Sequence, residues 1–342
     1  MTSKLTLSSP RIEITCAEAT TVVRDILLKA GCRNNVARIV AAHLVDSNLA
    51  GVESHGVMRV LQYVKQFQSG YMRIDGSAEI IEHDTFTEID GGGGIGIPTM
   101  LKAVEHSASM VSEKGIYALP IRNVGHTGRL GAFTELAAEA GCLMIVVGGG
   151  GRQKWRQVAP YGGRKAMLPT NPWSIAIPGG DRGPVVLDFA TAMIAGGWLY
   201  AAQSAGALLP SGSIIDAQGK PSRNPEDYFN GGAILPKGGP MGYGLAVMAE
   251  MIGEAMLGPV AVEANTLMIT MDTHRYREPH IFQAAAEEIL ADLRTSPAMG
   301  KNAVVEIPGE RERDHRTRRK AAHIEIPERT WHQINDLNNS LG

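Results

Sequence analysis

The chain has 342 residues, 44% of them hydrophobic, which is enough for the core of one large domain or two. Its 33 Lys and Arg against 35 Asp and Glu leave a net charge of −2, which excludes a global attraction to nucleic acid or to an anionic membrane. No apolar run approaches the about 18 residues of a membrane span, and no export signal is recognisable. The three widely spaced cysteines argue against a zinc site or a disulfide framework, so a cytoplasmic protein that binds small molecules is expected.

The first elements predicted are helices. Residues 17–49 predict two helices separated at 31–34, and Ser54 is expected to cap a third helix. This prediction puts His55 in the first helical turn and Arg59 four residues later on the same face. A titratable imidazole beside a guanidinium that grips a carboxylate suits reduction of a 2-oxo acid, or the reverse oxidation.

A glycine-rich run follows a strand or hairpin predicted at 80–89. Residues 91–96 read Gly-Gly-Gly-Gly-Ile-Gly and precede a helix predicted over 98–114. The run matches Gly-x-Gly-x-x-Gly, and Glu113 follows at about the distance of the acidic residue of dinucleotide sites. A run with this many glycines matches the template easily by chance, and no second βαβ half follows. A turn or close backbone packing is therefore the favoured interpretation, and dinucleotide binding remains the alternative.

A second histidine lies in a loop between a strand and a helix. Residues 116–121 predict the strand, residues 123–128 read Asn-Val-Gly-His-Thr-Gly, and a helix (130–140) and an apolar strand (143–147) follow. The loop presents His126 and free backbone N–H groups at a helix start, where phosphate binds readily. We expect His126 to be functional.

The middle of the chain adds further candidates. The basic, glycine-rich segment 148–163 lacks the ending of a phosphate loop and is interpreted as an active-site loop or an oligomer contact. Thr170-Asn171-Pro172 predicts a rigid turn before a strand at 174–177. The strand at 185–187 is expected to end at Asp188, which either anchors a cofactor or caps the next helix.

The C-terminal third is less informative. It predicts a buried, methionine-rich helix over 244–256, a core strand over 266–272, an amphipathic helix over 281–293 and a last helix starting near 326. The charged run 310–320 mixes acids with its basic residues, which favours a solvated face over polymer binding. Arg311 or Arg313 within it is a candidate for a cofactor 2′-phosphate.

Six short motifs recur in this order along the chain. They are Ser-His-Gly-x-x-Arg at 54–59, Asn-x-x-His-x-Gly at 123–128, Thr-Asn-Pro at 170–172, Asp-Phe-Ala-Thr at 188–191, Gly-Tyr-Gly-Leu at 242–245 and Pro-Gly-Glu-Arg at 308–311. In their order the chain resembles the type 2 malate/L-lactate dehydrogenases, which include the sulfolactate dehydrogenases. The resemblance covers nearly the whole chain, which makes coincidence improbable although each motif is weak.

The resemblance implies a fold and an assembly. The fold is α/β, with a three-layer, mixed-sheet cofactor domain of the sulfolactate dehydrogenase type, not a conventional Rossmann unit, over residues 76–310. A helical domain is formed by residues 1–75 with the C-terminal helix 325–342, and residues 311–342 return the chain to it. A homodimer is expected, with the active site near the subunit interface.

The resemblance also implies an activity. It is hydride transfer between NAD or NADP and a small 2-oxo or 2-hydroxy acid, malate-like or lactate-like. Reduction of cyclic 2-imino acids, of the piperideine or pyrroline-2-carboxylate type, is the alternative, and a non-catalytic binding relative is disfavoured. No metal is expected, because no clustered ligand set occurs.

By the resemblance, His55 is the general acid, and Ser54 orients it or relays its proton. Arg59 clamps the substrate carboxylate, and Thr170 adds a substrate hydrogen bond. His126 is the alternative proton donor and also a cofactor neighbour. The other residues expected at the cofactor are Thr127, Gly128, Arg129, Leu130, Asp188, Phe189, Ala190, Thr191, Ala192, Pro240, Met241, Gly309, Glu310 and Arg311.

Three positions depart from the family pattern. Met241 stands where many members have lysine, so a basic residue near the cofactor is lost. Ala192 replaces the usual serine, and Trp198 stands where a smaller or basic residue is usual. These departures bear on cofactor preference and substrate more than on the class of reaction.

Overall fold

A seven-stranded mixed sheet lies at the centre of the computed structural model, which describes residues 10–300, 303–319 and 323–342. The strand order is β2-β3-β4-β11-β5-β6-β7. Only β3 and β4 run parallel, and all other neighbours in this sheet are antiparallel. The strands are β2 (Glu79–Glu82), β3 (Thr87–Asp90), β4 (Ile116–Val124), β5 (Cys142–Gly149), β6 (Pro172–Ile177), β7 (Val185–Ala190) and β11 (Ala264–Asp272). Since a Rossmann sheet is mostly parallel, the expected mixed sheet of another type is confirmed.

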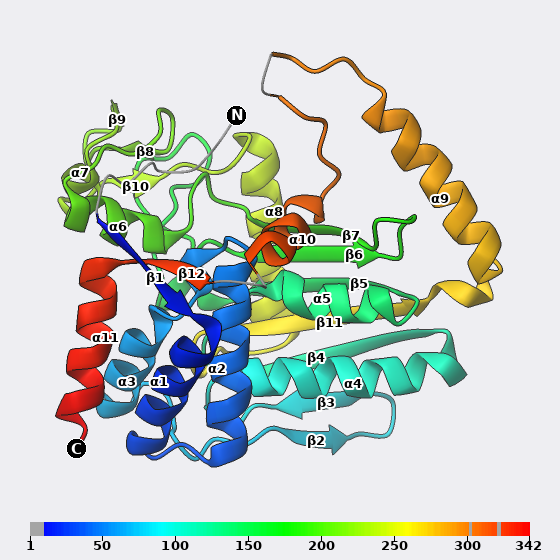
Figure 1. Ribbon diagram of the computed structural model, residues 1–342, viewed down its shortest axis with the longest axis horizontal. Helices are drawn as coiled ribbons and strands as arrows, with labels where there is room; N and C mark the ends of the chain where they lie inside the picture. The colour runs from blue at the N-terminus through cyan, green and yellow to red at the C-terminus, as the bar shows by residue number, and fades with distance from the viewer. Residues whose placement is uncertain (1–9, 301–302, 320–322) are drawn as a thin grey trace.

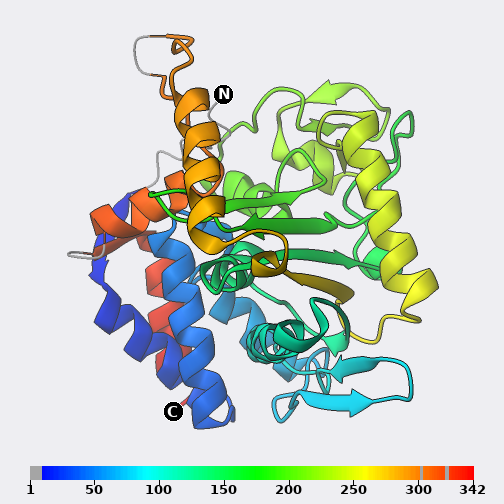
Figure 2. The ribbon, with the colours of Figure 1, turned by 90° about the vertical axis from the view of Figure 1, so that its right-hand side faces the viewer.

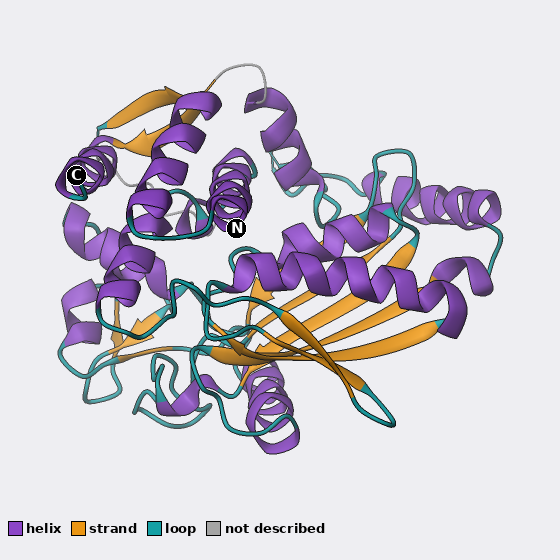
Figure 3. Cartoon of the chain, turned by 90° about the horizontal axis from the view of Figure 1, so that it is seen from below, coloured by secondary structure: helices purple, strands orange, loops and turns teal. Residues whose placement is uncertain are grey.

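Helices cover both faces of the sheet and complete three layers (Figure 3). Helices α4 (Gly96–Lys114) and α5 (Leu130–Glu139) pack on one face. Helix α8 (Pro240–Glu250) and the π-helical turn after it (Met251–Met256) pack on the other. The predicted helix is therefore present, but its predicted burial is wrong, because the side chains of Met248, Met251 and Met256 are 53%, 56% and 60% exposed. Small residues make the contact with the sheet instead.

The two ends of the chain meet in a helical unit beside the sheet (Figure 1). Strand β1 pairs antiparallel with β12, and helix α11 packs against α1 and α3. These elements are β1 (Arg11–Thr15), α1 (Cys16–Lys29), α2 (Asn34–Leu49), α3 (Arg59–Gln68), β12 (His323–Pro327) and α11 (Glu328–Ser340). The division into domains at residues 75 and 310 stays a prediction, and its first nine residues lie outside the described part of the chain.

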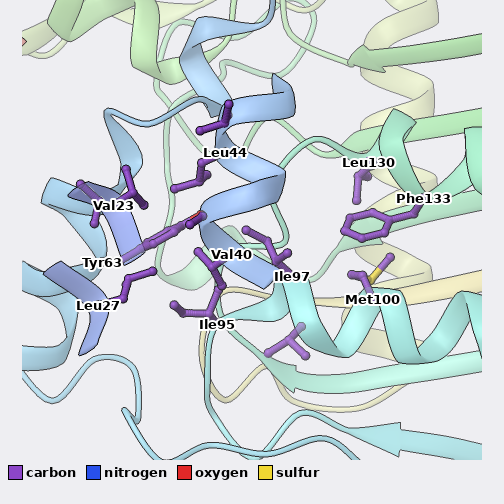
Figure 4. Close-up of a cluster of buried hydrophobic side chains, with 14 of the residues drawn as sticks. Val23, Leu27, Val40, Leu44, Tyr63, Ile95, Ile97, Met100, Leu130 and Phe133 are labelled. Carbon is purple, nitrogen blue, oxygen red and sulfur yellow. The ribbon is translucent and has the colours of Figure 1, made fainter. Parts of the chain in front are cut away.

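One hydrophobic core joins the helical unit to the sheet layer. Figure 4 shows Leu44 of α2 and Tyr63 of α3 in the same cluster as Ile97 and Met100 of α4 and Phe133 of α5. Each such side chain contributes about 1.5–3 kcal/mol when it is removed from water. The shared core holds α2 and α3 firmly against the start of α4 and α5, where the predicted site residues lie.

The remaining elements lie outside these two units. A small sheet of β8 (Ile214–Ile215), β9 (Pro221–Ser222) and β10 (Ala233–Ile234) is accompanied by α6 (Gly196–Ala205) and α7 (Pro225–Phe229). Helix α9 (Pro279–Arg294) extends along the outer side of the body (Figures 1 and 2). The charged run forms α10 (Glu310–Arg319), while its last residue, Lys320, lies outside the described residues. No helix among the described residues is long and apolar enough to cross a membrane.

Candidate active site

The first site segment is a short 3-10 turn and not the start of a helix. The turn spans Glu53–His55, and α3 begins only at Arg59. The predicted N-cap at Ser54 is therefore wrong, since its hydroxyl lies 3.0 Å from Nδ1 of His55 instead. The Arg59 guanidinium folds back, and its Nε donates to the Ser54 carbonyl over 2.5 Å. Histidine, serine and arginine are thus brought together by a compact turn.

A buried asparagine fixes this turn from below. Asn48 of α2 is 3% exposed, and its Oδ1 accepts a 2.8 Å hydrogen bond from the backbone N–H of Val57. A Cβ atom at Gly56 would lie 2.0 Å from the same oxygen, so only glycine fits between His55 and Val57. This close approach explains the glycine of the Ser-His-Gly sequence.

The glycine run at 91–96 supports the loop that carries His126. The N–H groups of Gly91 and Gly93 donate to backbone carbonyls of the strand β4, and that of Gly96 donates to the His126 carbonyl over 3.1 Å. The N–H of Gly125 donates back to the Gly94 carbonyl over 2.8 Å. The interpretation as close backbone packing is therefore correct. The dinucleotide interpretation fails because these amide groups are occupied and cannot cradle a phosphate.

The two candidate imidazoles face each other. The rings of His55 and His126 are stacked with centroids 5.5 Å apart and planes inclined by 22°. The Tyr63 hydroxyl lies 2.8 Å from Nδ1 of His126, and the Gly128 N–H donates to the same nitrogen over 3.2 Å. A backbone N–H can only donate, so Nδ1 carries a lone pair. Neutral His126 therefore bears its hydrogen on Nε2.

Both imidazoles are held in their neutral form. Burial, reinforced by the charge of Arg59, lowers the pKa of His55 to about 3. The same two causes hold the pKa of His126 well below its usual range. Neither histidine is fully buried as a residue, which leaves room for contact with a small molecule. The site thus combines one fixed cation with two neutral, stacked rings.

A third histidine, missed in the sequence, anchors the other end of the His126 loop. Nε2 of His43 in α2 accepts a 3.0 Å hydrogen bond from the Arg129 N–H, and its ring stacks on Phe133 at 5.1 Å. Gly128 has φ +73°, and a Cβ there would lie 2.3 Å from the same nitrogen. Tyr63 was missed as well, although it lies one helical turn after Arg59 and would be found by asking what α3 buries beneath the site.

Several residues expected at the cofactor surround one cavity of about 350 Å³. Arg129, Asp188, Gly309 and Arg311 line it. Asp188 lies inside β7, not at its end as predicted, and its Oδ2 accepts a 2.7 Å hydrogen bond from the Gly131 N–H at the start of α5. Burial raises the pKa of the Asp188 carboxyl. The alternative role as a cap of the next helix is excluded, because its partner belongs to α5.

Charged side chains crowd one wall of this cavity. Arg129 is 3% exposed, and its guanidinium lies 3.2 Å from Asp46 and 3.6 Å from Glu135. Arg316 of α10 contacts the same two carboxylates, at 2.9 Å and 2.7 Å. Nε of Arg129 is buried without a hydrogen-bond partner among the described residues. A donor in this state is suited to an oxygen of a bound ligand.

The other predicted cofactor residues do not line the cavity. The Glu310 carboxylate binds Arg294 at 2.6 Å and the Ile307 N–H at 3.0 Å, so its contacts are structural. His126, Thr127 and Gly128 lie in the loop before α5, whose first residue, Leu130, is buried. Phe189 and Ala190 pair with β6.

A separate group forms around Thr191. Its N–H and hydroxyl donate to the Thr170 carbonyl over 3.0 Å and 2.9 Å, and its own carbonyl accepts from the Lys237 N–H over 2.8 Å. Ala192 forms an isolated bridge with Pro236. Pro240 begins α8, and the Met241 side chain is 66% exposed. This group lies where β6 begins, β7 ends and α8 begins, outside the cavity.

Helix α6 lies opposite the Glu53–His55 turn. A Cβ atom at Gly197 would lie 3.6 Å from Nη2 of Arg59 and 3.6 Å from Cβ of Ser54. Among the described residues there is no group of three or more His, Cys, Asp or Glu side chains arranged to hold a metal ion. The side chains that meet in the site are two imidazoles, one guanidinium and the groups that orient them.

Comparisons with known proteins show the family of the chain. A family model described as malate/L-lactate dehydrogenase matches residues 14–335. The L-sulfolactate dehydrogenase of Methanocaldococcus jannaschii is 32% identical over 335 residues, 94% of this chain and 95% of that protein. A Delta(1)-pyrroline-2-carboxylate/Delta(1)-piperideine-2-carboxylate reductase of Pseudomonas putida is 32% identical over 254 residues, 73% of each chain. The solved structure of malate dehydrogenase from Pyrococcus horikoshii OT3 is similar with a TM-score of 0.86 at 25% identity, over 100% of this chain and 99% of that one. The chain therefore belongs to the malate/L-lactate dehydrogenase family.

Proposed function

We propose that this protein is a nicotinamide-dependent oxidoreductase that interconverts a small 2-oxo acid and the corresponding 2-hydroxy acid, malate-like or lactate-like. The observation that carries the proposal is the pair of neutral, stacked imidazoles, 5.5 Å apart, beside the Arg59 guanidinium. The reaction needs one group to hold the carboxylate and another to donate a proton to the carbonyl oxygen. The family of the chain acts on such acids, which supports this assignment.

Arg59 is the carboxylate-binding residue in this proposal. In the described part of the chain it donates to the Ser54 carbonyl and the Gln62 side chain and has no carboxylate within ion-pair distance. Its charge is therefore available to a substrate, and a guanidinium binds a carboxylate through two parallel hydrogen bonds. Thr170 remains the proposed source of a further substrate hydrogen bond.

The proton is assigned to His55. Nδ1 of His55 faces the Ser54 hydroxyl, which accepts a hydrogen bond when that nitrogen is protonated and donates one when it is not. His55 therefore suits both protonation states. Nδ1 of His126 faces the Gly128 N–H, which opposes protonation there. His126 is better suited to polarise the substrate oxygen through Nε2–H. His55 delivers a proton that it takes up from solvent during turnover, because the negative charge of the bound substrate carboxylate offsets Arg59 and raises the pKa of the ring.

The cofactor is assigned to the cavity at Arg129 and Asp188. A bound nicotinamide nucleotide supplies or removes the hydride. The unpartnered Nε of Arg129 and the half-exposed Arg311 are suited to oxygen atoms of a nucleotide, and the Asp188 carboxyl is suited to a hydroxyl group. Arg311 also contacts Glu312 at 2.6 Å. Either NAD or NADP is compatible with this combination of charges.

A cytoplasmic homodimer is part of the same proposal. Five large apolar residues are 41–62% exposed, namely Ile281, Ile289 and Leu293 on α9 and Met248 and Met251 beyond the sheet. Apolar surfaces of this kind are typical of subunit contacts. The reduced state of the cytoplasm agrees with three cysteines that are free in the structure.

A second candidate substrate class is the cyclic 2-imino acids. It is favoured by the 32% identity to the reductase of Pseudomonas putida. The same residues serve this reaction, with a nitrogen in place of the carbonyl oxygen. A non-catalytic relative is disfavoured, because Ser54, His55, Arg59 and His126 are all in place.

The test follows the absorbance of NADH and of NADPH in parallel with purified protein and a panel of 2-oxo acids and cyclic 2-imino acids. Oxidation of either cofactor by a panel member supports the proposal, and the preferred substrate distinguishes the two classes. Binding of both cofactors without turnover of any panel member contradicts the assigned substrate classes. No binding of either cofactor contradicts the proposal as a whole.

A further inference from the structure

A buried carboxyl group that the proposed reaction does not use lies beneath the site. Glu263 directly precedes β11, and its N–H donates to the Val124 carbonyl at the end of β4 over 3.2 Å. Val124 is two residues from His126, so Glu263 adjoins the loop that carries the second imidazole. Its Oε2 is buried and has no hydrogen-bond partner among the described residues. An unpartnered buried oxygen of this kind requires an explanation.

Among the described residues, none of the groups around Glu263 donates to its Oε2. From α3, Arg59 and Tyr63 act on it electrostatically, and Tyr71 from the following loop does the same. The Tyr63 hydroxyl is committed to His126, and the Tyr71 hydroxyl donates to the Val262 carbonyl over 2.9 Å. Lys154, from the 3-10 turn near residue 151, lies over the Tyr71 ring at 5.9 Å and donates to the Ala261 carbonyl. Arg59 is thus the cation that opposes the charge of this carboxylate.

Burial outweighs Arg59 and raises the pKa of Glu263 to about 7. Near neutral pH, before substrate binds, Arg59 is therefore a cation, and Glu263 is charged in some molecules and neutral in others. A substrate carboxylate that binds Arg59 adds a second negative charge beside the same guanidinium. Two carboxylates near one cation favour the neutral form of the buried one.

We infer that Glu263 couples the binding of a substrate carboxylate at Arg59 to the uptake of a proton. Glu263 is thus a positioning residue that acts through Arg59 and does not touch the reacting atoms. The inference rests on the proposed role of Arg59. Substrate affinity is then highest at low pH, where Glu263 is already neutral, and falls about tenfold per pH unit once Glu263 is ionised in the free enzyme.

The test is calorimetric binding of two unreactive probes to the NADH- or NADPH-loaded enzyme between pH 6.5 and 8.5. Oxamate represents 2-oxo acids and picolinate represents cyclic 2-imino acids. Buffers with different ionisation heats report the protons taken up. We expect uptake to rise toward one proton per probe at the highest pH, while the dissociation constant rises about tenfold over the last pH unit.

Glu263→Gln removes the titrating group and keeps its shape. We expect this variant to bind the probe with little proton uptake and with an affinity that hardly changes with pH. Glu254→Gln is the matched control, since Glu254 pairs with Arg152 at 2.9 Å and should behave as the wild type. Equal proton uptake in Glu263→Gln and the wild type overturns the inference alone. Binding of neither probe by any of the three proteins overturns the carboxylate site at Arg59, and with it the proposed function.

Discussion

The Tyr63→Phe substitution tests how the site fixes the tautomer of His126. The Tyr63 side chain is fully buried, and burial raises its pKa, so the hydroxyl keeps its proton. The change removes a 2.8 Å hydrogen bond and leaves the Gly128 N–H, at 3.2 Å, as the donor to Nδ1. A net hydrogen bond contributes about 0.5–1.5 kcal/mol, so the free energy of unfolding should fall by about 1 kcal/mol. Weaker orientation of Nε2–H should lower kcat/KM about tenfold, which corresponds to about 1.4 kcal/mol.

The assay compares steady-state rates, urea unfolding and the ¹⁵N chemical shifts of the imidazole nitrogens. Tyr117→Phe is a matched control, because its hydroxyl lies 3.1 Å from Nε2 of His106, away from the site. Both variants should lose similar stability, but only Tyr63→Phe should lose activity and show a mixture of tautomers at His126. Unchanged kcat/KM in Tyr63→Phe, with the His126 shifts of the wild type, would refute the reasoning.

Three further predictions concern charge. Arg59→Lys should raise KM about tenfold with little change in kcat, because lysine cannot form the two-pronged carboxylate contact; substrate saturation curves measure this. Arg129→Met should lower the free energy of unfolding, measured in urea, by about 3–5 kcal/mol, because the negative charges of Asp46 and Glu135 lose one of their arginine partners. Burial lowers the pKa of His43 to about 4, below the unfolded value near 6.5. The unfolded protein therefore binds more protons at His43 in this interval, and the contribution of His43 to stability should fall by about 3 kcal/mol as pH drops from 6.5 to 4. His55 and His126 add losses of the same sign, and His43→Gln should remove the His43 share alone.

Each of these has a result that contradicts it. A lower kcat with an unchanged KM in Arg59→Lys would place the arginine in the chemical step and not in substrate binding. Loss of less than about 1 kcal/mol in Arg129→Met would mean that Arg316 alone neutralises the two carboxylates. An acid transition of unchanged slope in His43→Gln would assign the proton uptake to other groups.

The sequence predicted those elements whose patterns are local. The strand or hairpin predicted at 80–89 is the hairpin of β2 and β3, and the two helices predicted over 17–49 correspond to α1 and α2. The order of strands in the sheet was not readable from the residues, because β11 enters between β4 and β5 from a distant part of the chain. The family resemblance supplied a three-layer, mixed sheet but no strand order.

The errors have a common physical cause. Ser54 has the chemistry of an N-cap, but its hydroxyl is used by His55, and α3 begins later. The methionines of 244–256 have the composition of a core, yet the π-helical turn approaches β5 through Gly149 and Gly253, and the long side chains point outward. In both cases a tertiary contact outweighs the local preference. Glu263 gave no signal, since its significance depends on Arg59, 204 positions earlier in the chain.

The most direct measurement of the central claim is a single-turnover experiment. Enzyme loaded with reduced cofactor is mixed with the best substrate of the panel, and the loss of cofactor absorbance is followed for the wild type, His55→Gln and His126→Gln. We predict a fast phase in the wild type, its disappearance in His55→Gln with cofactor affinity retained, and a slowed but measurable phase in His126→Gln. A fast phase of wild-type rate in His55→Gln, with the loss confined to His126→Gln, would contradict the account and assign the proton to His126.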